Sequence, residues 1–311
     1  MDDNPYSASL SKSSADTKGK PKGKQKAVLS DSDSSEDASS ASSSDSDSKP
    51  PSRRPASSLP AFIRARSLAA QVVLQYTPVQ SLLNSNDSIF LDFACGAGAL
   101  SHHVAEHIDR VLGIDIHPPA VAEFNLRAQN QGLDKSEMYA IACDVLDSVQ
   151  LDHVCAEWLG KIDIAACAMG FHHLPDMASV TKSITSNLLR SGGFMCVVDL
   201  LWTESTQTIF QNLKNAKDAM HHSHVHSHDH THAHHIGGIR SEDILKSFQF
   251  AQLVDIEVFE YAFELPVMIP EKLLPESMRS SRESSSQFTP SNPAKKIEIM
   301  LPFLFAVGRK K

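Results

Sequence analysis

The residues best placed to bind a ligand lie in a short motif of acid and glycine, Asp92 to Gly98, which reads Asp-Phe-Ala-Cys-Gly-Ala-Gly. Asp92 belongs to an apolar run over residues 88–93 that predicts a strand, and residues 99–107 predict the helix that follows. Glycine at positions 96 and 98 lets the backbone approach a ligand closely and adopt angles that a side chain would forbid. The motif therefore predicts a binding turn at the start of an α/β domain.

Two further acids stand at the ends of the next two predicted strands. Asp115 follows Asp92 by 23 residues and lies near the end of a strand over residues 110–116, where a carboxylate can accept both hydroxyls of an adenosine ribose. Asp144 follows a strand over residues 137–143, where its side chain and the adjacent backbone can read an adenine edge. Because parallel strands end at one crevice, all three acids are expected to face the same ligand.

Strand and helix patterns alternate along this part of the chain. Strands are predicted over residues 88–93, 110–116, 137–143, 162–169 and 194–200, and helices over 99–107, 118–131, 152–159 and 176–190. Such alternation predicts a parallel sheet covered by helices on both faces. A helix from about residue 60 lies outside this series. A helix near 205–220, a short helix whose first turn holds Glu242 and Asp243, and strands over 253–260 and 297–307 complete the pattern.

With these motifs the chain resembles the class I, seven-stranded S-adenosylmethionine-dependent methyltransferases. The resemblance covers most of residues 89–309, including residues 162–165, 188–194 and 303–308. In detail it is similar to the small-molecule enzymes of ubiquinone and menaquinone biosynthesis and to uncharacterised fungal relatives. The resemblance implies a Rossmann-like α/β sheet of order 3-2-1-4-5-7-6, with strand seven antiparallel and helices on both faces, and S-adenosyl-L-methionine as cofactor.

The predicted cofactor site combines the motif with this resemblance. It consists of Asp92, Ala94, Gly96, Gly98, Asp115, Ile116, Asp144 and Val145. Asp92 and the glycines are expected around the methionine end, Asp115 at the ribose, and Asp144 with Val145 near the adenine. Ala94 stands where the family usually has glycine, which predicts a slightly less tight turn. A dinucleotide is disfavoured because Ser101 replaces the third glycine of pyrophosphate-binding loops.

The candidate catalytic residues, His172 and His173, follow the fourth predicted strand. This segment lacks the Pro-Pro-aromatic and Pro-Cys signatures that the family uses for amide, amine and cytosine acceptors, which favours another small molecule. One histidine could act as general base on a hydroxyl or an acidic carbon. The alternative is a purely structural turn, because methyl transfer from a sulfonium can proceed through positioning and desolvation alone. Cys167 is interpreted as a core residue.

Residues 1–58 differ in composition from residues 59–311. The chain of 311 residues carries a formal net charge of −8, and its first 58 residues are Lys-rich and then Ser/Asp-rich with few apolar side chains. This composition predicts a disordered tail before one methyltransferase domain. The tail is a candidate substrate for acid-directed kinases, a candidate docking site for a basic partner, and a candidate nuclear-import signal through its lysines. A solvated linker is the simpler interpretation.

Composition also limits which binding partners and which cellular location are expected. Five cysteines show no paired pattern, which predicts a reducing compartment, and no apolar run is long enough to span a bilayer. The domain has no basic stripe, which argues against a nucleic-acid partner. The expected location is the cytoplasm, and also the nucleus if the lysine cluster acts as a signal.

Two segments interrupt the domain pattern. The first is a histidine tract of nine histidines that begins at His221 and ends at His235, with strict alternation from His222 to His234. An extended strand of this kind would place imidazoles on one face and could bind Zn, Cu or Ni. A low-complexity surface loop is the simpler interpretation, so no metal site is predicted for catalysis. The second segment is a Ser/Pro-rich insertion over residues 269–296 between the last two strands.

The sequence thus predicts an enzyme of class EC 2.1.1.- that transfers a methyl group from S-adenosyl-L-methionine to a small-molecule acceptor. A protein acceptor is the alternative within the class, and it would make methyl transfer depend on the acidic tail. A non-catalytic methyltransferase-like scaffold or metal-binding protein is the alternative outside the class.

Overall fold

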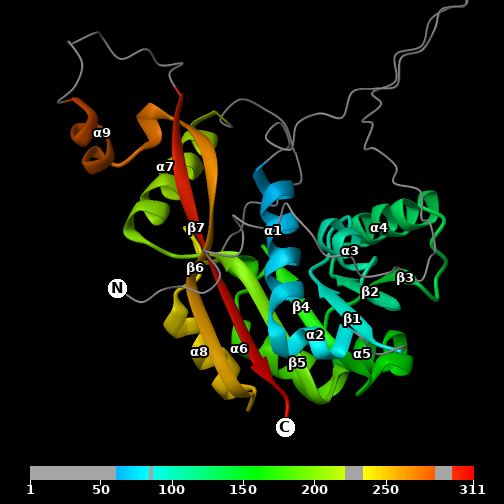
Figure 1. Ribbon diagram of the computed structural model, residues 1–311. Helices are drawn as coiled ribbons and strands as arrows, with labels where there is room; N and C mark the ends of the chain where they lie inside the picture. The colour runs from blue at the N-terminus through cyan, green and yellow to red at the C-terminus, as the bar shows by residue number, and fades with distance from the viewer. Residues whose placement is uncertain (1–60, 84–86, 221–233, 284–295) are drawn as a thin grey trace, which may run out of the picture.

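The computed structural model describes residues 61–83, 87–220, 234–283 and 296–311 (Figure 1). The predicted tail over residues 1–58, most of the histidine tract and residues 284–295 of the insertion lie outside the described residues.

Seven strands form one sheet in the order β3-β2-β1-β4-β5-β7-β6, which confirms the order that the resemblance implied. They are β1 (Ile89–Phe93), β2 (Arg110–Asp115), β3 (Met138–Ala142), β4 (Ile162–Ala168), β5 (Leu189–Leu200), β6 (Val254–Pro270) and β7 (Lys296–Arg309). The first five strands run parallel, and β7 is antiparallel to both of its neighbours. The strands β2 and β3 lie on one side of β1, and β4, the next strand in the chain, lies on the other side, so the strand order reverses at β1. Ligands of open α/β sheets bind at such a reversal.

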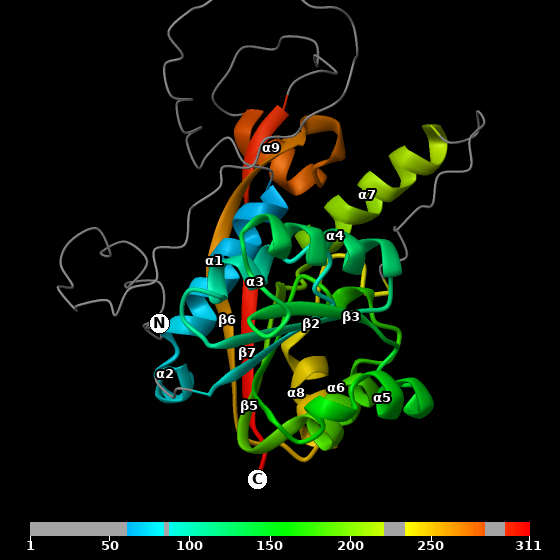
Figure 2. The ribbon, with the colours of Figure 1, turned by 90° about the vertical axis from the view of Figure 1, so that its right-hand side faces the viewer.

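Helices cover both faces of the sheet. They are α1 (Ala61–Gln75), α2 (Thr77–Leu83), α3 (Ala99–Val104), α4 (Pro118–Asn130), α5 (Ser148–Val154), α6 (Met177–Ser183), α7 (Glu204–Met220), α8 (Ser241–Phe250) and α9 (Glu276–Glu283). Helices α1, α3 and α4 bury side chains in one apolar cluster, and α5, α6 and α8 bury theirs in a second cluster on the opposite face (Figure 2). Because β1 and β4 lie between these clusters, all of their residues are buried, as their apolar sequences require.

The starts of helix α5 and strand β5 differ from the predicted ones. Helix α5 begins at Ser148, four residues earlier than predicted, because the Asp147 carboxylate accepts hydrogen bonds from the amides of Val149 and Gln150 and caps the helix. Strand β5 begins at Leu189 instead of residue 194. Its first residue pairs with Ile162 before an irregularity in the register, so the predicted helix over 176–190 ends earlier.

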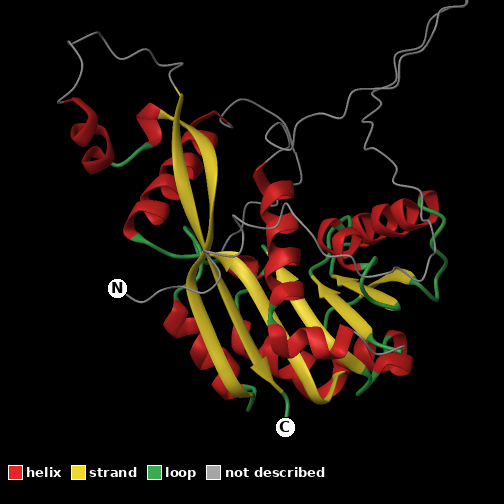
Figure 3. Cartoon of the chain, in the orientation of Figure 1, coloured by secondary structure: helices red, strands yellow, loops and turns green. Residues whose placement is uncertain are grey.

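The hairpin of β6 and β7 is longer than the sequence predicted. Strand β6 continues to Pro270, and its residues 263–270 pair with residues 296–303 of β7, whereas β5 pairs with β7 only from Phe303 onward. This part of the hairpin therefore projects beyond the rest of the sheet (Figure 3). The 3₁₀ turn after β6 contacts α7 through a 3.0 Å hydrogen bond from the Asn212 side chain to the carbonyl of Leu273. Helix α1 is tied to the hairpin because the Arg64 guanidinium donates a 2.8 Å hydrogen bond to the carbonyl of Pro266. Residues predicted to begin the insertion form the end of β6, a short 3₁₀ turn and α9.

No helix in the described ranges is long and apolar enough to cross a membrane.

A glycine at position 98 is required by the packing of α4 on the turn before α3. Gly98 has φ +87°, and a Cβ there would lie 2.8 Å from Phe124 Cδ2. Gly132 also has a positive φ, +75°, but nothing lies within 4 Å of its missing Cβ. We expect Gly98→Ala to lower the free energy of unfolding by about 2–4 kcal/mol and Gly132→Ala by about 1 kcal/mol, measured by urea unfolding. Equal losses would show that the contact with Phe124 is not the constraint.

Candidate active site

The turn after β1 is held in a left-handed conformation. Ala94, Gly96 and Gly98 have φ values of +55°, +53° and +87°. The amide of Cys95 donates to the carbonyl of Ile114, and the amide of Gly96 donates a 2.9 Å hydrogen bond to Asp115 Oδ2. The turn is therefore anchored on the carboxyl end of β2. Gly96 leaves the turn open beneath the Arg66 guanidinium, whereas the missing side chain of Gly98 faces Phe124.

Ala94 takes the left-handed conformation although it is not glycine, at a cost of about 1 kcal/mol. A Cβ on Gly170 would lie 2.9 Å from the Cβ of Ala94, so the alanine methyl fits because residue 170 has no side chain. The preceding residue, Met169, is also left-handed, with φ +60°. Backbone strain of this kind is typical of functional sites, and here it lies where β1 and β4 end side by side.

Asp92 is buried beneath this turn, with 2% of its surface exposed. Its Oδ2 accepts hydrogen bonds from Ser101 Oγ at 2.6 Å and from the Ser101 amide at 3.2 Å. Burial raises the pKa of the carboxyl to about 6, although Ser101 and the charge of Arg66 act in the opposite direction. A cation that reached this carboxylate would therefore stabilise its charged form.

Arg66 of α1 is a site residue that sequence reasoning missed. Its guanidinium lies 3.9 Å from the point where a Cβ of Gly96 would be, directly over the glycine turn. Its positive charge acts on Asp92 and on His172, which lie at the ends of different strands. No carboxylate among the described residues forms an ion pair with Arg66. The sequence signal was weak, because one arginine on an exposed stripe of an apolar helix is common.

Asp115 lies at the end of β2 and is buried. One oxygen holds the Gly96 amide, and the other accepts from the His117 amide at 2.9 Å and lies 3.1 Å from His117 Nδ1. The His117 side chain is 57% exposed, so it can turn away without loss of packing. The carboxylate would then keep both backbone bonds and still have lone pairs for two hydroxyls.

The remaining predicted cofactor residues surround the ends of β2 and β3. The amide of Cys143 donates to the carbonyl of Asp115, which brings these strand ends together. Ile116 is 59% exposed and offers an apolar surface there, whereas Val145 is buried. The Asp144 carboxylate accepts a 2.9 Å hydrogen bond from the Leu146 amide. An apolar side chain beside a fixed carboxylate suits a flat heterocycle with a polar edge.

The two candidate catalytic histidines lie in a 3₁₀ turn, Phe171–His173, directly after β4. His172 Nδ1 lies 2.7 Å from Oδ1 of Asp199, and the His172 amide donates to Oδ2 of the same carboxylate. The ring of His173 is 4.0 Å from that of His172, centre to centre. The structure thus places a carboxylate behind His172, and the pair forms an Asp–His dyad at the carboxyl ends of β4 and β5.

Asp199 was missed from the sequence because it lies inside an apolar strand. It is fully buried and also accepts a 2.7 Å hydrogen bond from the Leu200 amide. Burial by itself lowers the pKa of His172, but the charge and hydrogen bond of Asp199 outweigh it and raise the pKa above its ordinary value. With its proton on Nδ1 directed at Asp199, neutral His172 has Nε2 as a proton acceptor.

Cys167 lies close to this turn but is suited to packing. It is 1% exposed, and burial raises the pKa of its thiol well above the usual value. A thiol of this kind is not a nucleophile at neutral pH.

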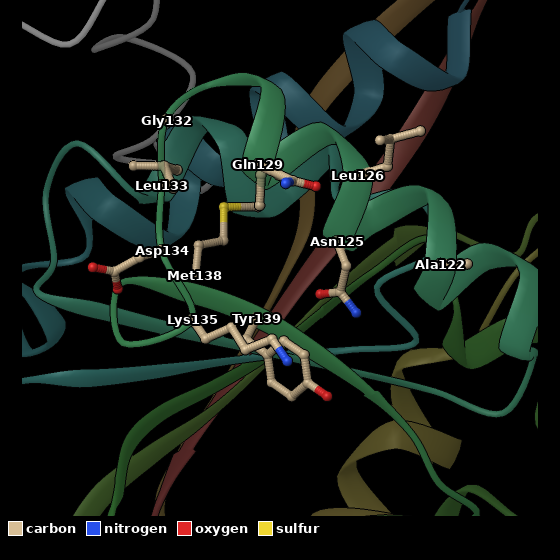
Figure 4. A pocket seen from close by; sticks show the side chains of 11 residues that line it. Ala122, Asn125, Leu126, Gln129, Gly132, Leu133, Asp134, Lys135, Met138 and Tyr139 are labelled. Carbon is tan, nitrogen blue, oxygen red and sulfur yellow. The ribbon is translucent and has the colours of Figure 1, made fainter.

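A hollow in the surface lies away from the glycine turn and the two histidines. It has a volume of about 670 Å³ between α4 and β3, where Leu126, Leu133 and Tyr139 contribute to its wall (Figure 4). The Asn125 amide hydrogen-bonds both the carbonyl and the amide of Ala140 at the edge of the sheet. None of the predicted site residues lines this hollow, so it is not the candidate active site.

The histidine tract, from His221 to His235, was the candidate metal site of the sequence. In the described part of the chain, no group of three or more His, Cys, Asp or Glu side chains is arranged to hold a metal ion. The described members of the tract, His234 and His235, therefore belong to no such group. His221 and the other members up to residue 233 lie outside the described residues. Metal binding by the tract stays a prediction, without support from the residues described.

Known proteins share this fold and part of this sequence. Residues 91–195 match the model of a family described as "Methyltransferase domain". An uncharacterized methyltransferase of Schizosaccharomyces pombe is 26% identical over 236 residues, which cover 75% of this chain and 76% of that protein. The YcgJ protein of Bacillus subtilis has a crystal structure with a TM-score of 0.51 and 15% identity, covering 79% of this chain and 98% of that one.

Shorter matches reach enzymes of named activity. The ubiquinone biosynthesis O-methyltransferase of Leptothrix cholodnii is 31% identical over 105 residues, 34% of this chain and 41% of that enzyme. The enzyme of the same name in Colwellia psychrerythraea is 25% identical over 133 residues, 43% of this chain and 50% of that enzyme. The chain thus matches half or less of the length of these two enzymes. The resemblance is confirmed to this extent: residues 91–195 match the methyltransferase-domain family, and the sheet has the order of the Rossmann-like methyltransferase fold.

The buried carboxyl of Asp92 makes the stability of the free protein depend on pH. Its folded pKa of about 6 lies above an unfolded value of about 3.9, so its contribution is fully present below pH 4 and is lost as the pH rises through 6. We expect Asp92→Asn to remove this loss and to raise the free energy of unfolding at pH 7.5 by up to about 3 kcal/mol. Chemical unfolding at pH 4.5 and pH 7.5 measures the effect.

Asp152→Asn is the matched control, because Asp152 is an exposed residue of α5. It is expected to change the free energy of unfolding by less than about 0.5 kcal/mol at either pH. A loss of stability at pH 7.5 in Asp92→Asn would contradict the destabilising role of the buried carboxyl.

Proposed function

We propose that this protein is an S-adenosyl-L-methionine-dependent methyltransferase that methylates a hydroxyl or similarly acidic group of a small molecule, with His172 as general base. The observation that carries the proposal is the Asp199–His172 dyad at the carboxyl ends of β4 and β5, next to the glycine turn. A base at the ends of β4 and β5 would face the acceptor, because the cofactor would occupy the part of the crevice at the glycine turn after β1.

The residues of the turn fit the cofactor end by end. Gly96 leaves the backbone surface clear, while Arg66 and Asp92 present opposite charges beside it. Such a pair suits an amino acid, whose carboxylate would bind Arg66 and whose ammonium group would approach Asp92. Asp115 would accept the ribose hydroxyls. Ile116, Val145 and Asp144 would hold the adenine. When bound, S-adenosylmethionine supplies a methyl group on a sulfonium, which is already activated for displacement.

His172 and Asp199 would handle the proton of the acceptor. Neutral His172 accepts it at Nε2 as the acceptor oxygen attacks the methyl carbon. The proton on Nδ1 stays on His172 and is donated in a hydrogen bond to Asp199, whose buried carboxylate, already held by the Leu200 amide, stabilises the imidazolium that forms. The raised pKa of His172 makes it a stronger base but leaves a smaller neutral fraction at low pH.

A small-molecule acceptor is supported by the segment after β4 and by the relatives. The turn Phe171–His173 has neither a Pro-Pro-aromatic sequence nor a Pro-Cys sequence. Two of the relatives bear names that refer to ubiquinone biosynthesis, which is a small-molecule pathway.

The proposal is tested with S-adenosylmethionine carrying a radiolabelled methyl group. The full chain is incubated with a cell extract that is separated into molecules below a few kilodaltons and macromolecules. We expect label in the small-molecule fraction and a rate about 10²–10⁴ lower for His172→Gln. His153→Gln is the matched control, because His153 is an exposed residue of α5 outside the candidate site. Label confined to the protein fraction would contradict the proposed acceptor.

The pH dependence of the same rate separates the base from a structural role. For the wild type, the rate should rise with pH through the raised pKa of His172 and then level off. In Asp199→Asn the carboxylate that raises this pKa is gone, so the rise should move to lower pH while the plateau falls. A lower plateau with an unmoved pH profile would show that Asp199 only supports the fold.

A further inference from the structure

A second hollow lies on the acceptor side of the dyad, where β5 ends and α7 and α8 begin. It has a volume of about 300 Å³, and its wall includes Trp202, Gln207, Gln211, His235, Arg240 and Asp243. Most of these side chains carry hydrogen-bonding groups, which is typical of a site for a polar ligand.

The backbone joins this hollow to the candidate active site. The amide of His235 donates a 3.0 Å hydrogen bond to the carbonyl of His172. Ile239 forms a parallel bridge with Leu201 at the end of β5, and its carbonyl accepts from the Trp202 amide. The hollow therefore lies at the carboxyl ends of the strands, beyond β5, whereas the glycine turn lies at β1. His172 is situated between the two.

Arg240 is an exposed residue that stacks on an aromatic ring, and no described residue accepts a hydrogen bond from its guanidinium. Its guanidinium carbon lies 3.4 Å from the centre of the Trp202 ring, so the flat cation stacks on the indole. Among the described residues no carboxylate pairs with it. The neighbouring acid, Asp243, lies 3.9 Å from Lys246 instead. Stacking uses the face of the guanidinium and leaves its N–H edge for a planar anion.

We propose that this hollow binds a carboxylate of the acceptor through Arg240, with Gln207 as a further hydrogen-bond donor. The inference rests on the proposed function and specifies its substrate class: a small acid that carries a hydroxyl for His172 and a carboxylate for Arg240. Lys246 offsets the charge of Asp243, so Arg240 supplies the unbalanced charge of the hollow.

Trp202 gives a direct measurement of binding. The chain has two tryptophans, so Trp158→Phe leaves Trp202 as the fluorescent residue. This variant, saturated with S-adenosylhomocysteine, is titrated with 4-hydroxyphenylacetate and with 4-hydroxyphenylacetamide, which has the same shape without the charge. We expect the carboxylate to quench Trp202 at a concentration at least about tenfold lower than the amide does.

Substitutions test whether Arg240 causes the preference for the carboxylate compound. Arg240→Gln is expected to abolish the preference for the carboxylate, and Arg240→Lys to reduce it, because lysine lacks the planar fork. Arg127→Gln, on the exposed side of α4 where Arg127 pairs with Glu123, should keep it fully.

Three results would overturn the inference: equal affinities for the two compounds, a preference that survives Arg240→Gln, or no quenching by either compound at about 20 mM. Calorimetry of S-adenosylhomocysteine on each variant is measured alongside. If S-adenosylhomocysteine binds and the carboxylate does not, the subsite fails while the proposed cofactor stands. If S-adenosylhomocysteine does not bind, the proposed function itself fails.

Discussion

Buried carboxylates at the carboxyl ends of parallel strands are the constraint on which this site depends. Asp92, Asp115 and Asp199 end β1, β2 and β5 or lie one residue before their ends, and each is largely removed from water. A buried charge is tolerated only with hydrogen bonds or an opposite charge. Ser101 supplies the hydrogen bonds for Asp92, the Gly96 and His117 amides supply them for Asp115, and His172 with Leu200 supplies them for Asp199. Each acid thereby fixes the segment that follows a strand.

Asp163 shows what a purely structural acid looks like in the same sheet. It lies at the start of β4, where it accepts a hydrogen bond from the Ile89 amide and pairs with Arg190. Each oxygen of its carboxylate therefore has a partner, and the residue lies at the amino end of β4, away from the candidate site. The guanidinium of Arg66 has no such partner in the described ranges, and that of Arg240 is stacked but unpaired. Both of these guanidinium groups lie at the carboxyl ends of the strands, beside the acids that shape the site.

Much of the fold could be predicted from the sequence because its signals are local. The alternation of apolar runs with helical segments, and the glycine turn after β1, follow from residues close to one another in the chain. The sheet order came from the resemblance, and pairing shows it to be correct. The start of α5 was wrong because its cap, Asp147, precedes a helix whose apolar pattern is weak. The length of β6 was missed because pairing with β7, across the insertion, determines it.

The candidate site likewise combines residues that the sequence predicted with residues that it missed. The glycines and the acids near them could be read from spacing, whereas Arg66 and Asp199 reach the site from distant elements. Arg66 comes from a helix outside the strand series, and Asp199 is an acid within an apolar strand whose partner, His172, is 27 residues away. Neither contact leaves a periodic signal in the sequence. The Asp–His pair supports the general base that we propose for His172.

The central claim is that the turn after β1 and the acid at the end of β2 bind the adenosine and amino-acid parts of S-adenosylmethionine. Calorimetric titration of the full chain with S-adenosylhomocysteine tests it most directly, with Asp115→Asn as the paired variant. We expect a dissociation constant of about 1–100 μM for the wild type and a value at least about tenfold higher for Asp115→Asn. Absence of binding at about 1 mM, by protein that unfolds cooperatively, would contradict the claim.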